Sequence, residues 1–335
     1  MQENLIFLIS TPRSGSTLLM RILNATQQIC SRPEPHLIPP LAHLGFWETV
    51  EKAPFDQLQA QIAMRELVDS FPGGAEDYYD ACRAYCDSLY KKMWKLSQQA
   101  DERYFLDKTP ANALVLPFLM KVYPRAKYIF LTRHPAAIFS SYANSFFDGD
   151  YKAAVDFNPI LSRYIPIMTE ALRQATVPMY HCSYEALVDA PEETLRALSD
   201  FLGIPFQKEA LNYQSAAVAK GLGDPLGVAK HQRPVQSSKA KWISELVEDK
   251  SKFEIVAKQL AGITERDLQT WGTPKDELWQ EMEGNSASAR KRKQEWSRYI
   301  LTRKLLIWLR RDIHNRPHGA LVKKLRFYCD VLLRG

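Results

Sequence analysis

Short runs rich in apolar residues mark the strands of this chain, and the first of them covers residues 5–9. A run of this kind between polar residues is typical of a strand that is buried on both faces, as in parallel sheets. Comparable runs predict strands at 104–106 and 126–132, and a weaker run predicts one at 177–182.

Between these runs the apolar positions recur at helical spacing. Helices are predicted from Thr17 onward and over 55–70, 76–100, 110–122, 136–147, 158–175 and 191–202. Strands that alternate with helices predict an α/β protein with a P-loop-like central parallel sheet flanked by helices. The segment 214–240 is rich in Gly and Pro and shows no period, so we expect a long loop of the kind that often covers a binding site.

Composition places the chain among globular proteins, since 46% of its 335 residues are hydrophobic and 24% are charged. No apolar run reaches the roughly 18–20 residues of a transmembrane helix, and the first four residues lack the basic region of a signal peptide. The five cysteines form no disulfide framework, and Cys82 and Cys86 lack a second Cys/His pair to complete a zinc site. We therefore expect a cytoplasmic protein without a metal ion.

Charge is distributed unevenly along the chain. Residues 286–335 carry 14 Lys and Arg against three acidic residues, a net charge of +11, whereas the remainder has a net charge of −5. We predict a main domain over 1–285 and a basic amphipathic helical extension over 286–335. The extension could pack back on the acidic body, dock on an acidic partner such as a carrier protein, or lie peripherally on an anionic membrane surface. No nucleic-acid recognition motif accompanies the charge, so nucleic acid is not an expected partner.

The loop 10–17 follows a predicted buried strand and opens a predicted helix. Unpaired backbone N–H groups and the helix dipole make such a loop suitable for binding an anion. Gly15 allows the backbone to approach the anion closely. Further donors come from Arg13, Ser14, Ser16 and Thr17.

This loop is not a Walker A motif, because position 10 is Ser and Ser16 replaces the Lys that follows the second Gly of that motif. The sequence also shows no apolar strand ending in Asp to hold a magnesium ion, since the strand at 126–132 runs into Arg133. These departures disfavour a P-loop kinase or NTPase, which stays as an alternative. A non-catalytic nucleotide-binding interaction module is the other alternative.

A second anion site is predicted at 133–141. Arg133 stands at the carboxyl end of a predicted central strand, where open α/β sheets bind ligands. Ser141 lies eight residues on, two turns into the next helix, so its hydroxyl can return to the same crevice. Two separated phosphate sites without a magnesium ligand indicate a doubly phosphorylated nucleotide that is bound by cations.

The loop 10–17 and the pair Arg133 and Ser141 resemble the cofactor motifs of sulfotransferases that use 3′-phosphoadenosine 5′-phosphosulfate (PAPS) and release the bisphosphate PAP. The branch that includes tyrosylprotein sulfotransferases and the sulfotransferase domains of bacterial polyketide assembly lines is the most similar. The resemblance spans about 4–245. It implies that the first loop binds the 5′-phosphosulfate, that the second site binds the 3′-phosphate, and that Tyr184 lies near the adenine. The segment 230–239 resembles a late loop that covers the cofactor.

The resemblance also implies the catalytic residues. Lys108, with Arg13, corresponds to the cations that contact the leaving group, and Glu34 corresponds to the acidic base of the tyrosylprotein branch. His36 stands where that branch has a cation, which argues against recognition of a tyrosine peptide. In an extended segment His36 points to the same side as Glu34, so it could serve as the base instead or orient the acceptor. We predict sulfuryl transfer to a hydroxyl acceptor, which could be a small molecule, a lipid or a carrier-bound acyl chain.

Overall fold

The computed structural model describes residues 1–42, 57–96, 103–212 and 240–282, together with isolated positions between 305 and 325. The predicted extension at 286–335 and the predicted loop at 214–240 lie almost wholly outside the described residues. Within the described ranges, none of the helices combines the length and the hydropathy that crossing a bilayer requires.

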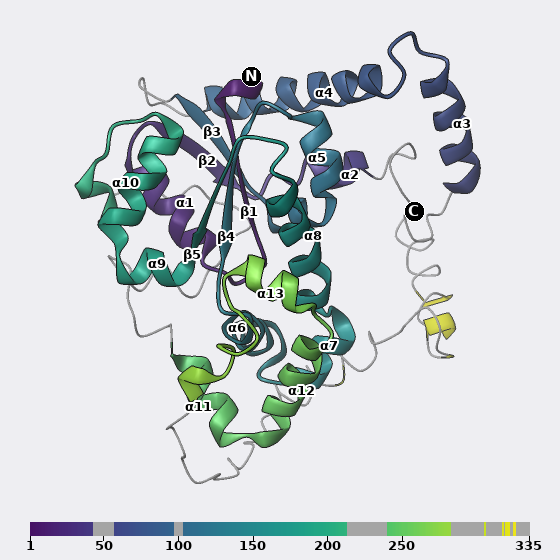
Figure 1. The fold of residues 1–335 in the computed structure, drawn as a ribbon. Coiled ribbons are helices and arrows are strands. Elements are labelled where there is room, and N and C mark those ends of the chain that lie inside the picture. Colours follow the sequence, from purple (N-terminus) through teal and green to yellow (C-terminus); the bar gives the residue numbers. More distant parts are fainter. Residues whose placement is uncertain are drawn as a thin grey trace.

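A five-stranded parallel sheet forms the centre of the fold (Figure 1). Its strands, in the order β2-β3-β1-β4-β5, are β2 (Ile29–Pro33), β3 (Tyr104–Lys108), β1 (Leu5–Ser10), β4 (Lys127–Thr132) and β5 (Met179–Ser183). The chain passes from β1 to the edge strand β2, returns to β3 beside β1, and then continues on the other side of β1 with β4 and β5, so the order switches sides at β1. Ligands of open α/β sheets bind at such a switch point, outside the carboxyl ends of the strands.

Helices cover both faces of the sheet. One face packs against α1 (Ser16–Ala25), α9 (Tyr184–Asp189) and α10 (Pro191–Leu202). The other face packs chiefly against α4 (Ala75–Lys95), α5 (Leu116–Val122), α6 (Pro135–Phe147) and α8 (Ile160–Gln174). The remaining helices are α2 (Ile38–Ala42), α3 (Gln57–Asp69), α7 (Tyr151–Phe157), α11 (Lys241–Glu248), α12 (Lys250–Ala261) and α13 (Glu265–Trp271). Four short 3₁₀ turns complete the described elements at η1 (Gln2–Asn4), η2 (Pro110–Val115), η3 (Lys208–Leu211) and η7 (Gln280–Met282).

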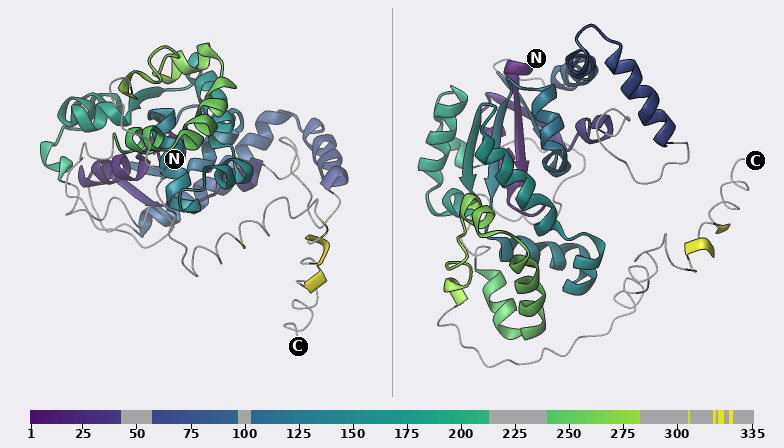
Figure 2. Two further views of the ribbon diagram at one scale, coloured as in Figure 1. Left: turned by 90° about the horizontal axis from the view of Figure 1, so that it is seen from below. Right: turned by 45° about the vertical axis from the view of Figure 1, so that its right-hand side comes forward.

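Helices α11–α13 gather beyond the carboxyl ends of the strands, as the green segments of Figure 1 and of the right-hand view in Figure 2 show. Helix α6 begins at the same edge, directly after β4. The two predicted anion sites, the β1–α1 loop and the β4–α6 turn, therefore lie at the edge where the C-terminal helices pack.

The predicted α/β class with a parallel central sheet flanked by helices is confirmed, and each of the four predicted strands is present. Strand β2 was not predicted. Its sequence, Ile-Cys-Ser-Arg-Pro, has only one strongly apolar residue. As an edge strand it pairs with β3 alone, so it needs less of the continuous apolar character that marks a central parallel strand.

Candidate active site

The β1–α1 loop has the form of an anion cradle. Gly15 precedes α1 with a left-handed backbone (φ 94°), and Ser16 and Thr17 open the helix. Arg13 is also left-handed, with φ 70°, a conformation that costs a non-glycine residue about 1–3 kcal/mol and is concentrated at functional sites. The loop is thus held in a strained backbone shape directly before the N-terminus of α1.

Two hydroxyls that the sequence reasoning passed over lie at the same place. Ser10 and Thr11 are fully buried, and their side-chain oxygens have no hydrogen-bond partner among the described residues. Ser14, by contrast, donates its hydroxyl proton to the Thr11 carbonyl oxygen (2.9 Å) and so maintains the loop. Buried hydroxyls normally have partners, so Ser10 and Thr11 are suited to meet a bound anion. The sequence feature that could have indicated them is their position, since Ser10 and Thr11 directly follow the apolar run 5–9.

Gly15 is also required by the packing of Tyr184, the first residue of α9. A Cβ atom at position 15 would lie 2.4 Å from the Tyr184 ring, far inside van der Waals contact. The loop backbone therefore lies directly against the Tyr184 ring. The residue that the family resemblance assigns to the adenine is in contact with the loop that it assigns to the 5′ end.

The two predicted anion sites form one cluster. The Arg13 Nε atom donates to the Ser141 hydroxyl oxygen (3.2 Å), and an Arg133 Nη atom donates to the Arg13 carbonyl oxygen (3.1 Å). The Arg133 guanidinium lies over the Tyr184 ring at 4.3 Å. Arg133 is only 9% exposed, and burial lowers its pKa. A buried arginine stays charged, so a bound anion would compensate the cost of its desolvation.

Glu34 and Lys108 meet at the end of the β2–β3 pair. The register places Pro33 opposite Lys108, and the Lys108 ammonium donates to a Glu34 carboxylate oxygen at 2.5 Å. Lys108 is only 2% exposed, whereas the Glu34 side chain is 20% exposed. The carboxylate thus neutralises a buried cation while keeping a path to solvent.

His36 contacts Glu34 as expected, but its backbone conformation differs from the extended one that was predicted. Its Nε2 atom lies 3.4 Å from the second carboxylate oxygen of Glu34, so the two side chains do share a side. The segment is not uniformly extended, because His36 has φ 50°. Its backbone N–H donates to the Thr109 hydroxyl at 3.4 Å, and this contact holds the turn against β3.

Asp107 is a buried acidic residue whose role the sequence analysis did not consider. It lies in β3, next to β1 in the sheet, and it is fully buried. Its carboxylate accepts from the Tyr90 hydroxyl (2.6 Å) and the Thr109 hydroxyl (2.7 Å), and burial raises its pKa. Neighbouring strand residues point to opposite faces, so Asp107 faces α4 while Lys108 faces the other way. The sequence feature that could have indicated its burial is an acidic residue directly after the apolar strand residues Phe105 and Leu106.

The pairs Glu34–Lys108 and Arg13–Arg133 belong to neighbouring strand ends, since β3 and β4 flank β1 on its two sides. Adjacent strands are about 4.8 Å apart, so both groups open on the same edge of the sheet. The predicted late loop at 230–239 lies outside the described residues. Among the residues that are described, no group of three or more His, Cys, Asp and Glu side chains is placed to hold a metal ion.

Fold and site together define an α/β protein in which two arginines, a helix-opening loop and a carboxylate–lysine pair gather at the carboxyl edge of a parallel sheet. A model of the Sulfotransferase family matches residues 5–208. The chain belongs to the sulfotransferase family, and the resemblance seen in its motifs is confirmed.

The relatives are distant. The nodulation protein NoeE of Sinorhizobium fredii is 34% identical over 135 residues, which cover 40% of this chain and only 30% of that protein. Protein-tyrosine sulfotransferase 1 of Danio rerio is 26% identical over 268 residues, 77% of this chain and 71% of that one. Among solved structures, the sulfotransferase domain of the Synechococcus PCC 7002 olefin synthase is 25% identical with a TM-score of 0.49, and the match covers 78% of this chain and 95% of that domain.

Proposed function

We propose that the chain transfers a sulfuryl group from PAPS to a hydroxyl acceptor. The observation that carries the proposal is the cluster of Arg13, Arg133, Ser141 and Tyr184, which joins the two predicted anion sites and an aromatic ring at the switch point of the sheet. Membership of the sulfotransferase family supports it. PAPS, when bound, supplies an activated sulfuryl group on a nucleotide that also carries a 3′-phosphate.

The residues present fit such a nucleotide. The buried hydroxyls of Ser10 and Thr11 have no partner among the described residues, and the Gly15 backbone lies so close to the Tyr184 ring that a Cβ atom would clash with it. The loop 13–17 would hold the 5′ end through backbone N–H groups and Arg13. Arg133 and Ser141 would hold the 3′-phosphate, and Tyr184 would lie near the adenine.

The Glu34–Lys108 pair supplies the proton transfer and the charge stabilisation that sulfuryl transfer needs. Glu34 would take the proton of the acceptor hydroxyl while the oxygen of that hydroxyl attacks the sulfur atom in line. Protonation removes the negative partner of Lys108, whose buried ammonium is then free to stabilise the charge on the leaving phosphate together with Arg13. One proton would thus both activate the acceptor and release the lysine.

His36 leaves an alternative for the base. Its ring is 44% exposed and touches the Glu34 carboxylate, so it could accept the proton directly or pass it from Glu34 to solvent. The acceptor could be a small molecule, a lipid or a carrier-bound acyl chain, since each presents a hydroxyl group to the same carboxylate.

Binding of PAP is the experiment that tests the proposal. We expect PAP to raise the melting temperature of the wild-type protein, because a ligand at 100 times its Kd adds about 2.7 kcal/mol to stability. ATP with Mg²⁺ should have little effect. Arg133→Ala should abolish most of the PAP effect, whereas Arg125→Ala, which removes a 69% exposed cation paired with Glu3, should keep it.

The reverse pattern would overturn the proposal. Stabilisation by ATP with Mg²⁺ but not by PAP would favour a P-loop kinase or NTPase, and PAP binding with no turnover of any hydroxyl acceptor would favour a non-catalytic nucleotide-binding module.

We also propose that residues 1–285 carry this activity and that the basic extension 286–335 binds an anionic membrane surface, which makes a cytoplasmic protein peripheral to the membrane. The site residues all precede position 185. In the extension, the described residues Leu305, Leu321 and Leu325 are more than half exposed, and cations surround them in the sequence.

Truncation after residue 285 separates the two parts. The truncated protein is expected to bind PAP as the full chain does and to lose co-sedimentation with phosphatidylserine vesicles, with phosphatidylcholine vesicles as the neutral control. Loss of PAP binding would contradict the domain division. If the truncated protein still sediments with the vesicles, or if the full chain does not sediment, the membrane proposal is wrong. The extension would then pack on the main domain or bind an acidic partner.

A further inference from the structure

The turn formed by Arg133 and His134 is held from outside the sheet by the C-terminal helices. The Trp271 indole N–H, on the last residue of α13, donates to the Arg133 carbonyl oxygen at 2.9 Å, and this bond is buried. The His134 ring stacks on Trp242 of α11, with 4.3 Å between centroids and 15° between planes. His134 Nε2 also bonds the Leu278 carbonyl oxygen at 3.1 Å.

These contacts constrain the backbone rather than the guanidinium. Within the sheet, β4 pairs with β5 up to Thr132, the residue directly before Arg133. On its outer side the Arg133 carbonyl is held by Trp271. The direction of the Arg133 side chain, toward the Arg13 carbonyl and the Tyr184 ring, follows from a backbone that is fixed on both sides.

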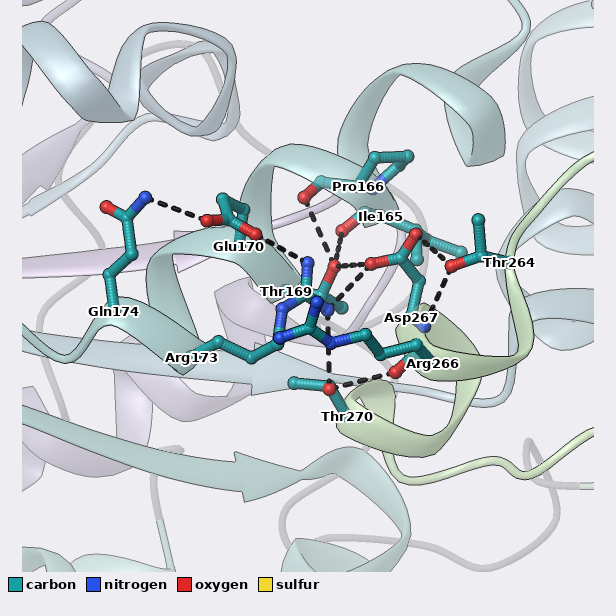
Figure 3. A network of polar contacts seen from close by, with 10 residues as sticks. All are labelled: Ile165, Pro166, Thr169, Glu170, Arg173, Gln174, Thr264, Arg266, Asp267 and Thr270. Atoms are coloured by element: carbon teal, nitrogen blue, oxygen red, sulfur yellow. Dashed lines mark hydrogen bonds and ion pairs between the residues drawn. The ribbon is translucent and has the colours of Figure 1, made fainter.

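Helix α13 is itself anchored to α8 by a polar network (Figure 3). The Asp267 carboxylate accepts from the Thr169 hydroxyl (2.7 Å) and from Arg173 (2.8 Å). It also accepts from the Thr264 hydroxyl (2.6 Å), which in turn caps the start of α13. Trp271 lies four residues after Asp267, one helical turn further on, so the network sets the place of the indole.

We infer that Trp271 is a positioning residue for Arg133, and that α11–α13 serve the 3′-phosphate half of the site. The inference rests on the proposed function. These helices lie beyond the residues 5–208 that the family model matches, so their part in nucleotide binding does not come with the family assignment. Trp271 acts through the Arg133 backbone rather than by contact with the nucleotide.

Trp271→Phe tests the inference, because it keeps an aromatic ring and removes the N–H donor. Calorimetric titration would compare PAP with AMP, which lacks the 3′-phosphate. Loss of one buried hydrogen bond corresponds to about 5- to 10-fold in affinity. We expect PAP to bind that much more weakly while AMP binding is unchanged, and the KM for PAPS to rise while kcat changes little.

Two further variants control for damage to the fold. Trp94→Phe makes the same chemical change in α4, which is separate from α11–α13, and should leave the PAP/AMP affinity ratio unchanged. Asp267→Asn weakens the anchor of α13 without touching Arg133, and should lower the ratio less than Trp271→Phe. The melting temperature of each protein without ligand shows whether it has folded.

The outcomes distinguish the two proposals. If the wild-type protein does not bind PAP, the proposed function fails. If the wild type binds PAP and folded Trp271→Phe either keeps its PAP/AMP ratio or loses affinity for both nucleotides equally, the proposed function stands and the positioning role of Trp271 is wrong. If Trp271→Phe does not fold, an unchanged ratio in Asp267→Asn overturns the inference.

Discussion

Replacement of Glu34 by Gln is expected to lower kcat by about 10²- to 10⁴-fold, the usual contribution of a general base. The amide keeps the size of the side chain and an oxygen that can accept from Lys108, so the fold and PAP binding should persist. The deficit should be largest for an aliphatic alcohol and smaller for an acidic phenol, because an acidic hydroxyl needs less help in losing its proton. Radiolabelled PAPS with a series of alcohols, phenols and tyrosine peptides measures it.

His36→Gln is the matched variant for this measurement, since it removes the other candidate base and keeps a polar side chain. If Glu34→Gln keeps the wild-type kcat and His36→Gln loses it, the base is His36. A deficit that is the same for every acceptor hydroxyl would assign Glu34 a role other than proton transfer. Full activity in both variants would show that the β2–α2 segment does not contain the base.

Replacement of Lys108 by Met is expected to lower kcat by about 10²- to 10³-fold, the usual effect of removing one group that stabilises developing charge. Met has nearly the volume of the buried lysine stem, and Glu34 keeps access to solvent through its 20% exposure. The protein should therefore fold without leaving an isolated buried charge. Single-turnover rates at saturating PAPS would report the chemical step.

Lys121→Met in α5 removes an exposed lysine and should leave these rates unchanged. The double variant Glu34→Gln/Lys108→Met adds a sharper test. If one proton transfer both activates the acceptor and releases Lys108, the two losses overlap and the double variant is far less impaired than the product of the single effects. Multiplicative losses would show that the base and the lysine act independently.

Much of the fold could be predicted because its elements are locally encoded. The strands β1 and β4 are buried on both faces and are read directly from apolar runs. The strand–loop–helix order around Gly15 identified the anion cradle in the same way. Strand β2 escaped prediction because an edge position tolerates Ser and Arg, and Asp107 escaped because its burial depends on Tyr90, 17 residues away.

The sequence predicted the residues of the candidate site, but it did not predict which of them lie in contact. Spacing alone indicated that Arg133 and Ser141 could share a crevice. Nothing local placed Trp271 behind Arg133, 138 residues earlier in the chain, because an indole in an amphipathic helix is ordinarily a core residue. The role inferred for Trp271 depends on how α13 docks on α8.

The sequence by itself determined the parallel α/β class and predicted the two anion loops, because backbone hydrogen bonding and side-chain periodicity act over a few residues. The candidate catalytic residues came from the resemblance of its motifs to a family. The tertiary structure decided which of these residues meet. Glu34 reaches Lys108 across 74 residues, and Arg13 reaches Ser141 across 128. These side-chain contacts follow from the order and register of the strands, and packing of the whole sheet against its two helical layers sets both.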